Sequence, residues 1–367
     1  MNGDRLMEYT SEEKAYIWLD SFALERNEKR RLLSQAGGAA ALVRDFPRFG
    51  KELIKSGKES VYNTMLESLS DGGEGLKKTL GKLEREGIKA VARVSADYPD
   101  ALKNRADAPP VFYARGNTAL LKTRMFAVVG SRRTPAAALR LGAEICRELS
   151  GAFTVLTGTA EGGDSAAITG ALKGSGNVVS VAAGGFSSLP QGNAALLSKA
   201  AERWLLLSAH TFSAPVRNFS YESRNALLAA LCEGVLVLGA GKDSGALITA
   251  RYAGREGKKI FALPYAPGAA AGVGCNALIK KGAYLTENSV DISGAFGINL
   301  IEEKSIPALS DDEAAALNAL KELSEAHVCE LSAKTGMPPF KLYAVLSALE
   351  VKGLAVRLGG NRYAPVK

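Results

Sequence analysis

The sequence predicts an α/β protein whose centre is an extended Rossmann-like, doubly wound and mainly parallel sheet. Three observations support this fold class. From about Phe126 onward, short β-rich runs alternate with helical segments, whereas the residues before them have mostly helical patterns. The last sixty residues change again, to three helices and a hairpin. A chain of 367 residues suggests two or three domains, and we expect them at 1–95, 96–300 and 308–367.

The first domain is predicted to be a small helical module of the SAM or helix-hairpin-helix type. The segment SEEKAYIWLDSF begins with Ser11, a candidate helix cap, and KRRLLSQAGGAAALVRDF holds two apolar stretches separated by Gly37 and Gly38. A helix, a glycine turn and a second helix are typical of modules that grip a nucleic-acid backbone through the turn. They are equally typical of any small helical bundle.

The central domain repeats a strand followed by a helix. The predicted strands are FAVVG, TVLTG, NVVSVAAG, WLLLSA, GVLVLGA and KIFALPY. The predicted helices are AAALRLGAEICRELS, DSAAITGALKG, NAALLSKAAER, SYESRNALLAAL, GALITARYAGREG and CNALIKKG. Each strand ends in glycine or small residues before the chain continues toward the next helix, which indicates a parallel sheet covered on both faces.

The C-terminal segment is predicted to be a winged helix. DDEAAALNALKE, HVCELSAKTGM and PPFKLYAVLSALEVKG give three helices, and LAVRLGGNRYAPVK gives a two-stranded hairpin around Gly359 and Gly360. The third helix has only Lys341 and Lys352 as basic residues. A DNA contact and a protein or dimer contact therefore both remain open for this domain.

Composition favours a polyanionic partner without requiring one. The chain has 46 Lys and Arg against 38 Asp and Glu. Its polar N-terminus does not resemble a signal peptide, and no apolar run reaches the roughly 18 residues of a membrane span. We therefore expect a cytoplasmic protein with no membrane partner. Cys146, Cys232, Cys275 and Cys329 are too far apart in sequence for a metal or redox motif, and we expect buried free thiols.

Three loops with small residues follow strands of the predicted sheet, and they should meet at its carboxyl edge. They contain Gly130, Ser131, Arg132 and Arg133 in GSRRTP, Gly158 and Gly162 in GTAEGGDSAA, and Lys242, Ser244 and Gly245 in GAGKDSGALITA. Backbone amides at helix starts and guanidinium groups suit phosphate groups. Glycines after parallel strands are also often only tight turns, and Asp164 is most simply a helix cap.

Five cations are predicted at this same edge. They are Arg132, Arg133, Arg217, Arg224 and Lys242. An edge with so many cations is better placed to bind a run of phosphates than one small neutral substrate. Aromatic side chains beside it, Tyr221 or Phe186, would stack on unpaired bases unless they only pack.

Catalytic patterns are scarce. The two histidines, His210 and His327, lie in different predicted domains, and the sequence has no GxSxG, HExxH, clustered cysteines or paired carboxylates. It also lacks the GxGxxG and GxxxxGK[ST] nucleotide-binding loops, which argues against a dinucleotide-dependent oxidoreductase. We expect binding rather than turnover, with no enzyme activity, cofactor or metal.

These motifs resemble those of the bacterial DNA-processing protein A family, also called DprA or Smf. The resemblance covers most of residues 97–290. In order, the motifs are YPDALKNRADAPPVFYARGN, VVGSRRTP, LTGTAEGGDSAAITGAL, SRNALLAAL, SGALITA and GCNALIKKGA. The helical module and the winged helix also fit this family.

The resemblance implies a competence protein that binds and protects single-stranded DNA, forms homodimers and loads the RecA recombinase in natural transformation. Carried over by motif, it implies DNA contacts at Gly130, Ser131, Arg132, Gly158, Gly162, Asn193, Arg224, Asn225, Ser244, Gly245 and Thr249. Arg224 is expected to reach a phosphate, and Asn225 either to brace the loop or to meet a base.

The chain departs from the family pattern at several positions. Ile168 lies in the helix after Asp164, where the family usually has histidine. In the motif that is usually Phe-Pro-x-Arg-Asn-Arg, Glu222 and Ala226 add a carboxylate and remove an arginine, so we expect a lower DNA affinity. Arg217 is a possible substitute for the lost arginine.

The alternative function is a nucleotide-binding Rossmann-like enzyme of the nucleoside-monophosphate phosphoribohydrolase type. Such enzymes share this kind of sheet and use a PGGxGTxxE-like loop with a catalytic glutamate. The corresponding segment here, GAGKDSGALITA, has no glutamate. Release of free base from a nucleotide would favour this alternative.

Overall fold

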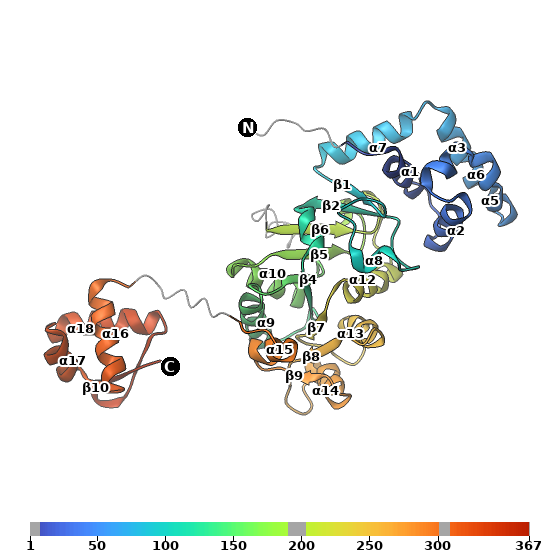
Figure 1. The fold of residues 1–367 in the computed structure, drawn as a ribbon. Coiled ribbons are helices and arrows are strands. Elements are labelled where there is room, and N and C mark those ends of the chain that lie inside the picture. Colours follow the sequence, from blue (N-terminus) through green and yellow to red (C-terminus); the bar gives the residue numbers. More distant parts are fainter. Residues whose placement is uncertain (1–7, 190–202, 301–308, 367) are drawn as a thin grey trace. The chain divides into compact units, whose positions relative to one another are not determined.

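The computed structural model describes residues 8–189, 203–300 and 309–366. The chain divides into two compact units, Met1–Ile301 and Glu302–Lys367. Figure 1 shows the first as helices followed by a sheet with helices on both sides, and the second as a small bundle.

The N-terminal helices form a small bundle with its own core. They are α1 (Ser11–Asp20), α2 (Arg26–Ala36), α3 (Ala39–Arg44), α4 (Phe46–Phe49), α5 (Lys51–Lys55), α6 (Glu59–Ser70) and α7 (Glu74–Arg85). Trp18, Leu42 and Phe46 are buried between them. The cap of α1 is Thr10 rather than the expected Ser11, because the Thr10 hydroxyl accepts a hydrogen bond from the Glu13 amide.

The predicted glycine turn joins α2 to α3, with both glycines at positive φ. The amides that begin α3 already have an anionic partner within the chain. The carboxylate of Glu12 accepts hydrogen bonds from the amides of Ala39 (2.6 Å) and Ala40 (2.9 Å). These amides are therefore not free to bind a phosphate, and the arrangement favours a structural bundle over a nucleic-acid grip at this turn.

The central sheet has nine strands among the described residues, in the order β1-β2-β6-β5-β4-β3-β7-β8-β9. The strands are β1 (Lys89–Ala92), β2 (Val111–Gly116), β3 (Met125–Val129), β4 (Thr154–Thr157), β5 (Val178–Ala182), β6 (Trp204–Ser208), β7 (Gly234–Val237), β8 (Lys259–Ala262) and β9 (Tyr284–Leu285). From β6 to β9 in this order, neighbouring strands run parallel. The β1-β2 and β2-β6 pairs are antiparallel. The sheet therefore starts at Lys89, inside the range expected to be only helical.

Helices cover both faces of this sheet (Figure 1). They are α8 (Asp100–Lys103), α9 (Ala136–Leu149), α10 (Gly163–Lys173), α12 (Asn218–Leu231), α13 (Ala246–Arg255), α14 (Val273–Lys280) and α15 (Ser289–Phe296). Successive β3 residues enter different cores: Phe126 and Val128 join one hydrophobic cluster, and Ala127 and Val129 the other. This two-sided burial explains the continuous apolar runs in the sequence. The expected helix NAALLSKAAER lies mostly outside the described residues.

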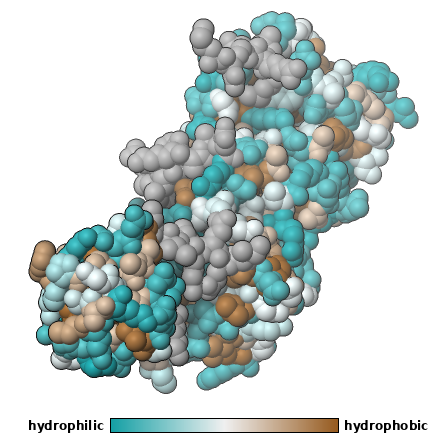
Figure 2. Space-filling view, turned by 60° about the vertical axis from the view of Figure 1, so that its left-hand side comes forward, coloured by the Kyte–Doolittle hydropathy of each residue, from teal (hydrophilic) through white to brown (hydrophobic). Residues whose placement is uncertain are grey.

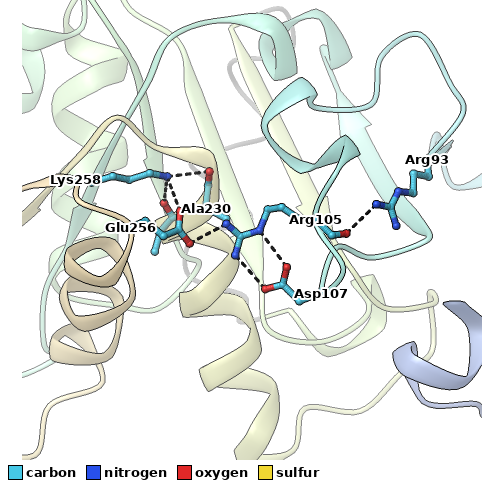
Figure 3. A network of polar contacts seen from close by, with 7 residues as sticks. Arg93, Arg105, Asp107, Ala230, Glu256 and Lys258 are labelled. Atoms are coloured by element: carbon cyan, nitrogen blue, oxygen red, sulfur yellow. Dashed lines mark hydrogen bonds and ion pairs between the residues drawn. The ribbon is translucent and has the colours of Figure 1, made fainter.

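A polar network fixes the C-terminal end of α12 (Figure 3). The Lys258 ammonium donates to the carbonyls of Ala229 (2.5 Å) and Ala230 (3.0 Å), which belong to the last turn of this helix. Glu256 pairs with Lys258 at 3.1 Å and with Arg105 at 2.9 Å. The helix that carries the SRNALLAAL motif is thus anchored in its last turn.

The C-terminal unit is a winged helix with a separate core. It contains α16 (Asp311–Leu323), β10 (Ala326–His327), α17 (Val328–Thr335), α18 (Pro339–Val351), β11 (Ala355–Arg357) and β12 (Arg362–Pro365). The predicted hairpin is present, and β10 extends it to a three-stranded sheet in the order β10-β12-β11. Leu320, Leu346 and Tyr363 are buried in this core.

Three of the four cysteines are buried free thiols, as expected. Burial raises the pKa of Cys146 and Cys232 to about 12 and that of Cys275 to about 11. The expectation is wrong for Cys329, which is exposed near the start of α17 because the apolar residues around it in sequence face the core. Within the described ranges, no helix is long and apolar enough to cross a membrane.

Candidate nucleic-acid interface

A cavity of about 670 Å³ lies where the carboxyl ends of β3, β4, β7 and β8 meet the N-terminal turns of α12 and α13. This is the position where open parallel sheets bind ligands. The structure brings nine of the predicted residues into its wall: Gly130, Ser131, Arg132, Arg133, Arg224, Asn225, Ser244, Gly245 and Thr249. Their contact with DNA remains a prediction.

The first two loops of the wall pack backbone against backbone. A Cβ atom on Gly163 would lie 2.4 Å from the Cα atom of Gly130, and one on Gly162 would lie 2.8 Å from the Cα atom of Arg132. Gly162 also has φ of 90°, which disfavours other residues. These glycines are needed for the close approach of the two loops, a local reason that does not require a ligand.

Gly158 leaves room for a buried ion pair. A Cβ atom there would lie 2.0 Å from Nη1 of Arg224 and 2.3 Å from Oδ2 of Asp164. These two atoms are 3.9 Å apart, and both side chains are less than a tenth exposed. Gly158 is not among the residues that line the cavity, so its part in the site is to admit this pair.

Arg224 is more enclosed than the sequence suggests. Its Nε donates to Oδ1 of Asn225 at 2.9 Å, and its Nη1 donates to the carbonyl of Val181 at 3.1 Å. The amide nitrogen of Asn225 donates in turn to the carbonyl of Gly245 at 3.1 Å. Nε and Nη1 of Arg224 therefore already have partners within the chain, and Asn225 joins α12 to the loop before α13. This agrees with the bracing role expected as one option for Asn225.

Asp164 lies in the first turn of α10, whose cap is Gly162 rather than the expected Asp164. Its Oδ2 accepts a hydrogen bond from the Ala160 amide at 3.1 Å, so it closes the loop before the helix. Burial raises the pKa of this carboxyl, while the nearby Arg224 guanidinium lowers it. Burial has the larger effect, so the pKa of Asp164 is above its ordinary value.

The N-terminus of α13 adds polar groups to the cavity wall. Gly245 is its cap, and Ser244 precedes it. One turn into the helix, Thr249 is fully buried, and its hydroxyl has no hydrogen-bond partner among the described residues. A buried hydroxyl without a partner is costly, and a ligand that enters the cavity could satisfy it.

The predicted cations are distributed around the cavity rather than gathered in it. Arg132 and Arg133 are exposed and line it, whereas Arg217 and Lys242 are exposed but do not. No ion pair within the described part of the chain involves these four side chains. They are available to a polyanion. Asn193 lies outside the described residues.

The two candidate stacking residues differ. Tyr221 lines the cavity and is 40% exposed, so it can meet a base. Phe186 is buried, with the Arg115 guanidinium 5.1 Å from its ring centre, which fits the packing alternative for this residue. The carboxylate of Glu222 accepts a hydrogen bond from the Tyr252 hydroxyl at 3.1 Å. Glu222 does not line the cavity, so the negative charge gained in this motif lies outside it.

The rest of the cavity wall includes two carboxylates and, after β8, two alanines. Its lining carboxylates are Asp164 and Asp243, and the described residues contain no group of three or more histidine, cysteine or acidic side chains that could hold a metal ion. Ala270 and Ala271, after β8, complete the wall. Sequence reasoning missed them because two alanines carry no chemical signal.

Comparisons with known proteins cover both the central sheet and the C-terminal unit. The family model described as DNA recombination-mediator protein A matches residues 89–297, and that of the DprA winged helix domain matches residues 302–361. The DNA processing protein DprA of Bacillus subtilis is 33% identical over 195 residues. That alignment covers 52% of this chain and 65% of the relative, just under two thirds of its length.

Two solved structures are also similar. The DprA structure from Streptococcus pneumoniae superposes with a TM-score of 0.66 and 26% identity, covering 78% of this chain and 98% of that one. A structure concerned with the single-stranded DNA binding mode of DprA from Helicobacter pylori has a TM-score of 0.50 and 25% identity, covering 57% of this chain and 95% of that one.

Proposed function

Because the chain belongs to the DNA recombination-mediator protein A family, we propose that it binds single-stranded DNA at the cavity and its cationic surroundings. The observation that carries this proposal is the set of exposed cations around a cavity at the carboxyl edge of the sheet, which form no ion pair among the described residues. Arg132 and Arg133 line the cavity itself. Several phosphates of one strand would lie along these cations, and Tyr221 would stack on a base.

The cavity wall suits single-stranded DNA better than double-stranded DNA. Its wall combines backbone amides at helix starts, the unpartnered Thr249 hydroxyl and one partly exposed aromatic ring. Such a wall accepts an unpaired base beside its phosphate, whereas bases in a duplex are already stacked and paired. Binding should tolerate many sequences and weaken strongly with salt.

The proposal includes protection of the bound strand and its transfer to the RecA recombinase during natural transformation. Support comes from family membership and from the relatives' description as DNA-processing proteins.

We also propose a homodimer through the β9 edge of the sheet. Tyr284 and Leu285 of this edge strand and Val290 of α15 are each about half exposed or more. An exposed edge strand can pair with another chain, and exposed apolar patches mark protein–protein contacts. Sedimentation velocity should show that a Leu285→Glu substitution shifts the protein from dimer to monomer.

The test of DNA binding is fluorescence anisotropy of labelled oligothymidine and of a matched duplex over a salt series. The variant is Arg132→Ala/Arg133→Ala. Its control is Lys173→Ala/Lys280→Ala, which removes two exposed cations from the C-terminal ends of α10 and α14, away from the cavity. We expect a preference for the single strand that the first variant loses and the control retains.

Equal losses in both variants would mean that only net charge matters, and the cavity would not be the site. No binding at low salt would refute the proposal itself. In that case, release of free base from nucleoside monophosphates should be measured next, because the nucleotide-binding enzyme is the remaining alternative.

A further inference from the structure

The third helix of the winged-helix unit, α18, presents an apolar stripe to solvent. Phe340 is 79% exposed and Val351 is 90% exposed. Ala344 and Ser347 are exposed between them, and Tyr343 flanks them at 38%. Phe340, Ala344, Ser347 and Val351 are spaced by four, three and four residues, so they form one line along the helix. We call Phe340, Tyr343, Ala344, Ser347 and Val351 the α18 stripe. Figure 2 shows hydrophobic atoms exposed on this unit.

The charges of residues 309–367 in this unit are balanced, and most of them form ion pairs with one another. Residues 309–367 contain seven Lys and Arg and seven Asp and Glu. The pairs are Lys334 with Glu322 (2.5 Å), Lys341 with Asp312 (2.7 Å), Lys352 with Glu313 (2.6 Å) and Arg362 with Glu325 (2.6 Å). The two basic residues of the third-helix segment, Lys341 and Lys352, are both used in this way. A helix that reads DNA needs an excess of free cations, which this unit does not have.

We propose that the α18 stripe binds the same stripe of a second copy of this chain, with the two helices antiparallel. The order of side-chain sizes along the stripe carries this choice of partner. Large residues lie at the two ends, and small residues lie in the middle. When such a helix is rotated by a two-fold axis through its middle, large ends meet large ends, and the small residues let the two backbones approach closely.

The pairing is self-complementary in side-chain size and in charge. Phe340 of one copy meets Val351 of the second copy, so the most exposed apolar side chains cover each other. Ala344 meets Ser347 near the axis. Because residues 309–367 have equal numbers of acidic and basic side chains, two copies repel each other little. This contact is distinct from the β9 edge and does not depend on the DNA site.

A contact made by one pair of helices is small and therefore weak on its own. It gains strength when two chains are already held together by another contact, because the effective concentration of the stripe is then high. The winged helix would in this way connect protein copies instead of adding a second DNA-binding surface.

The test is disulfide trapping in the full-length chain. Cys329→Ser removes the exposed thiol, and the other three cysteines are buried. In this background, Ser347→Cys places a thiol beside the proposed axis, within reach of its own copy. Asn361→Cys places one on the exposed wing as the control. We expect mild oxidation to give a covalent dimer with Ser347→Cys and none with Asn361→Cys, and an added Val351→Glu to abolish it.

The proposal would be overturned if oxidation of Ser347→Cys gave no disulfide-linked dimer, or no more of it than Asn361→Cys gives. The second measurement is anisotropy with Phe340→Asp/Val351→Glu, whose positions are exposed and whose fold is checked by thermal melting. Unchanged binding to oligothymidine and duplex is expected. A several-fold loss would show that the stripe contacts DNA and would also overturn the proposal. If the wild type binds no DNA at all, trapping still decides the inference on its own.

Discussion

At the scale of single residues, the two arginines that sequence reasoning treated alike have different environments. Arg132 is exposed at the cavity, whereas Arg224 is buried against Asp164, Asn225 and the Val181 carbonyl. A buried charge that loses its partner destabilises a protein strongly, whereas an exposed one does not. Loss of DNA binding after removal of Arg224 would therefore combine a binding effect with a folding effect, which is why Arg132 and Arg133 are the better test of the site.

Gly158→Ala should destabilise the protein by about 1 to 3 kcal/mol, because the new methyl group overlaps Arg224 and Asp164. Gly245→Ala is the matched control. Its Cβ would have only the Asn225 amide nitrogen nearby, at 3.8 Å, and its φ of −56° suits alanine. Urea denaturation measures both, and the control should stay within about 0.5 kcal/mol of the wild type. Equal effects of the two substitutions would show that the pair around Gly158 is not tightly packed.

Asp164 makes a pH-dependent contribution of defined sign. Its pKa is raised in the folded state, mainly by burial, so the folded protein binds the proton more tightly than the unfolded chain does. The associated stability is fully present below the unfolded pKa and is lost as the pH rises through the folded pKa. The free energy of unfolding of the wild type, relative to Asp164→Asn, should fall as the pH rises from acid toward neutral. A difference that rises instead would mean that Arg224 dominates and lowers this pKa.

At the scale of elements, α12 is held at its middle and at its C-terminal end by contacts far apart in sequence. Its second turn carries Arg224 and Asn225, which join it to β5 and to the loop before α13. Its last turn is capped by Lys258, from the segment before β8. The helix therefore transmits the packing of the sheet to the cavity wall, and its position depends on residues that do not line the cavity.

Lys258→Met should cost about 1 kcal/mol of stability, because it keeps the apolar stem but removes the ammonium group that donates hydrogen bonds to the Ala229 and Ala230 carbonyls. Lys280→Met, at the exposed end of α14, is the control and should be neutral. Thermal unfolding measured in parallel compares the two. A neutral Lys258→Met would indicate that water replaces the ammonium group at these carbonyls.

At the scale of the whole molecule, the chain is two units with separate cores, and the exposed cations of the cavity belong only to the first. The second is electrically balanced, so the proposed division of labour is DNA on the sheet and protein on the winged helix. In the N-terminal bundle, the Glu12 carboxylate already accepts hydrogen bonds from the first two amides of α3, after the glycine turn.

Thiol reactivity tests the packing of both units together. Cys329 should react quickly with a thiol reagent in the native protein, whereas Cys146, Cys232 and Cys275 should react only after unfolding, because burial shields them and raises their pKa. Titration should therefore give one fast thiol per chain in buffer and four in denaturant. More than one fast thiol would mean that the first unit opens readily.

The strand and helix alternation, the winged helix and the edge of the sheet where the loops meet could be predicted from local sequence patterns. They follow from periodicity and from glycine after buried strands, which act over a few neighbouring residues. Three features became visible only in the folded chain: Gly158 makes room for Arg224, Glu12 binds the amides after the glycine turn, and β1 and β2 extend the sheet. Each of these depends on two segments far apart in the chain meeting at atomic distance, and no local pattern records which distant side chain will fill a given space.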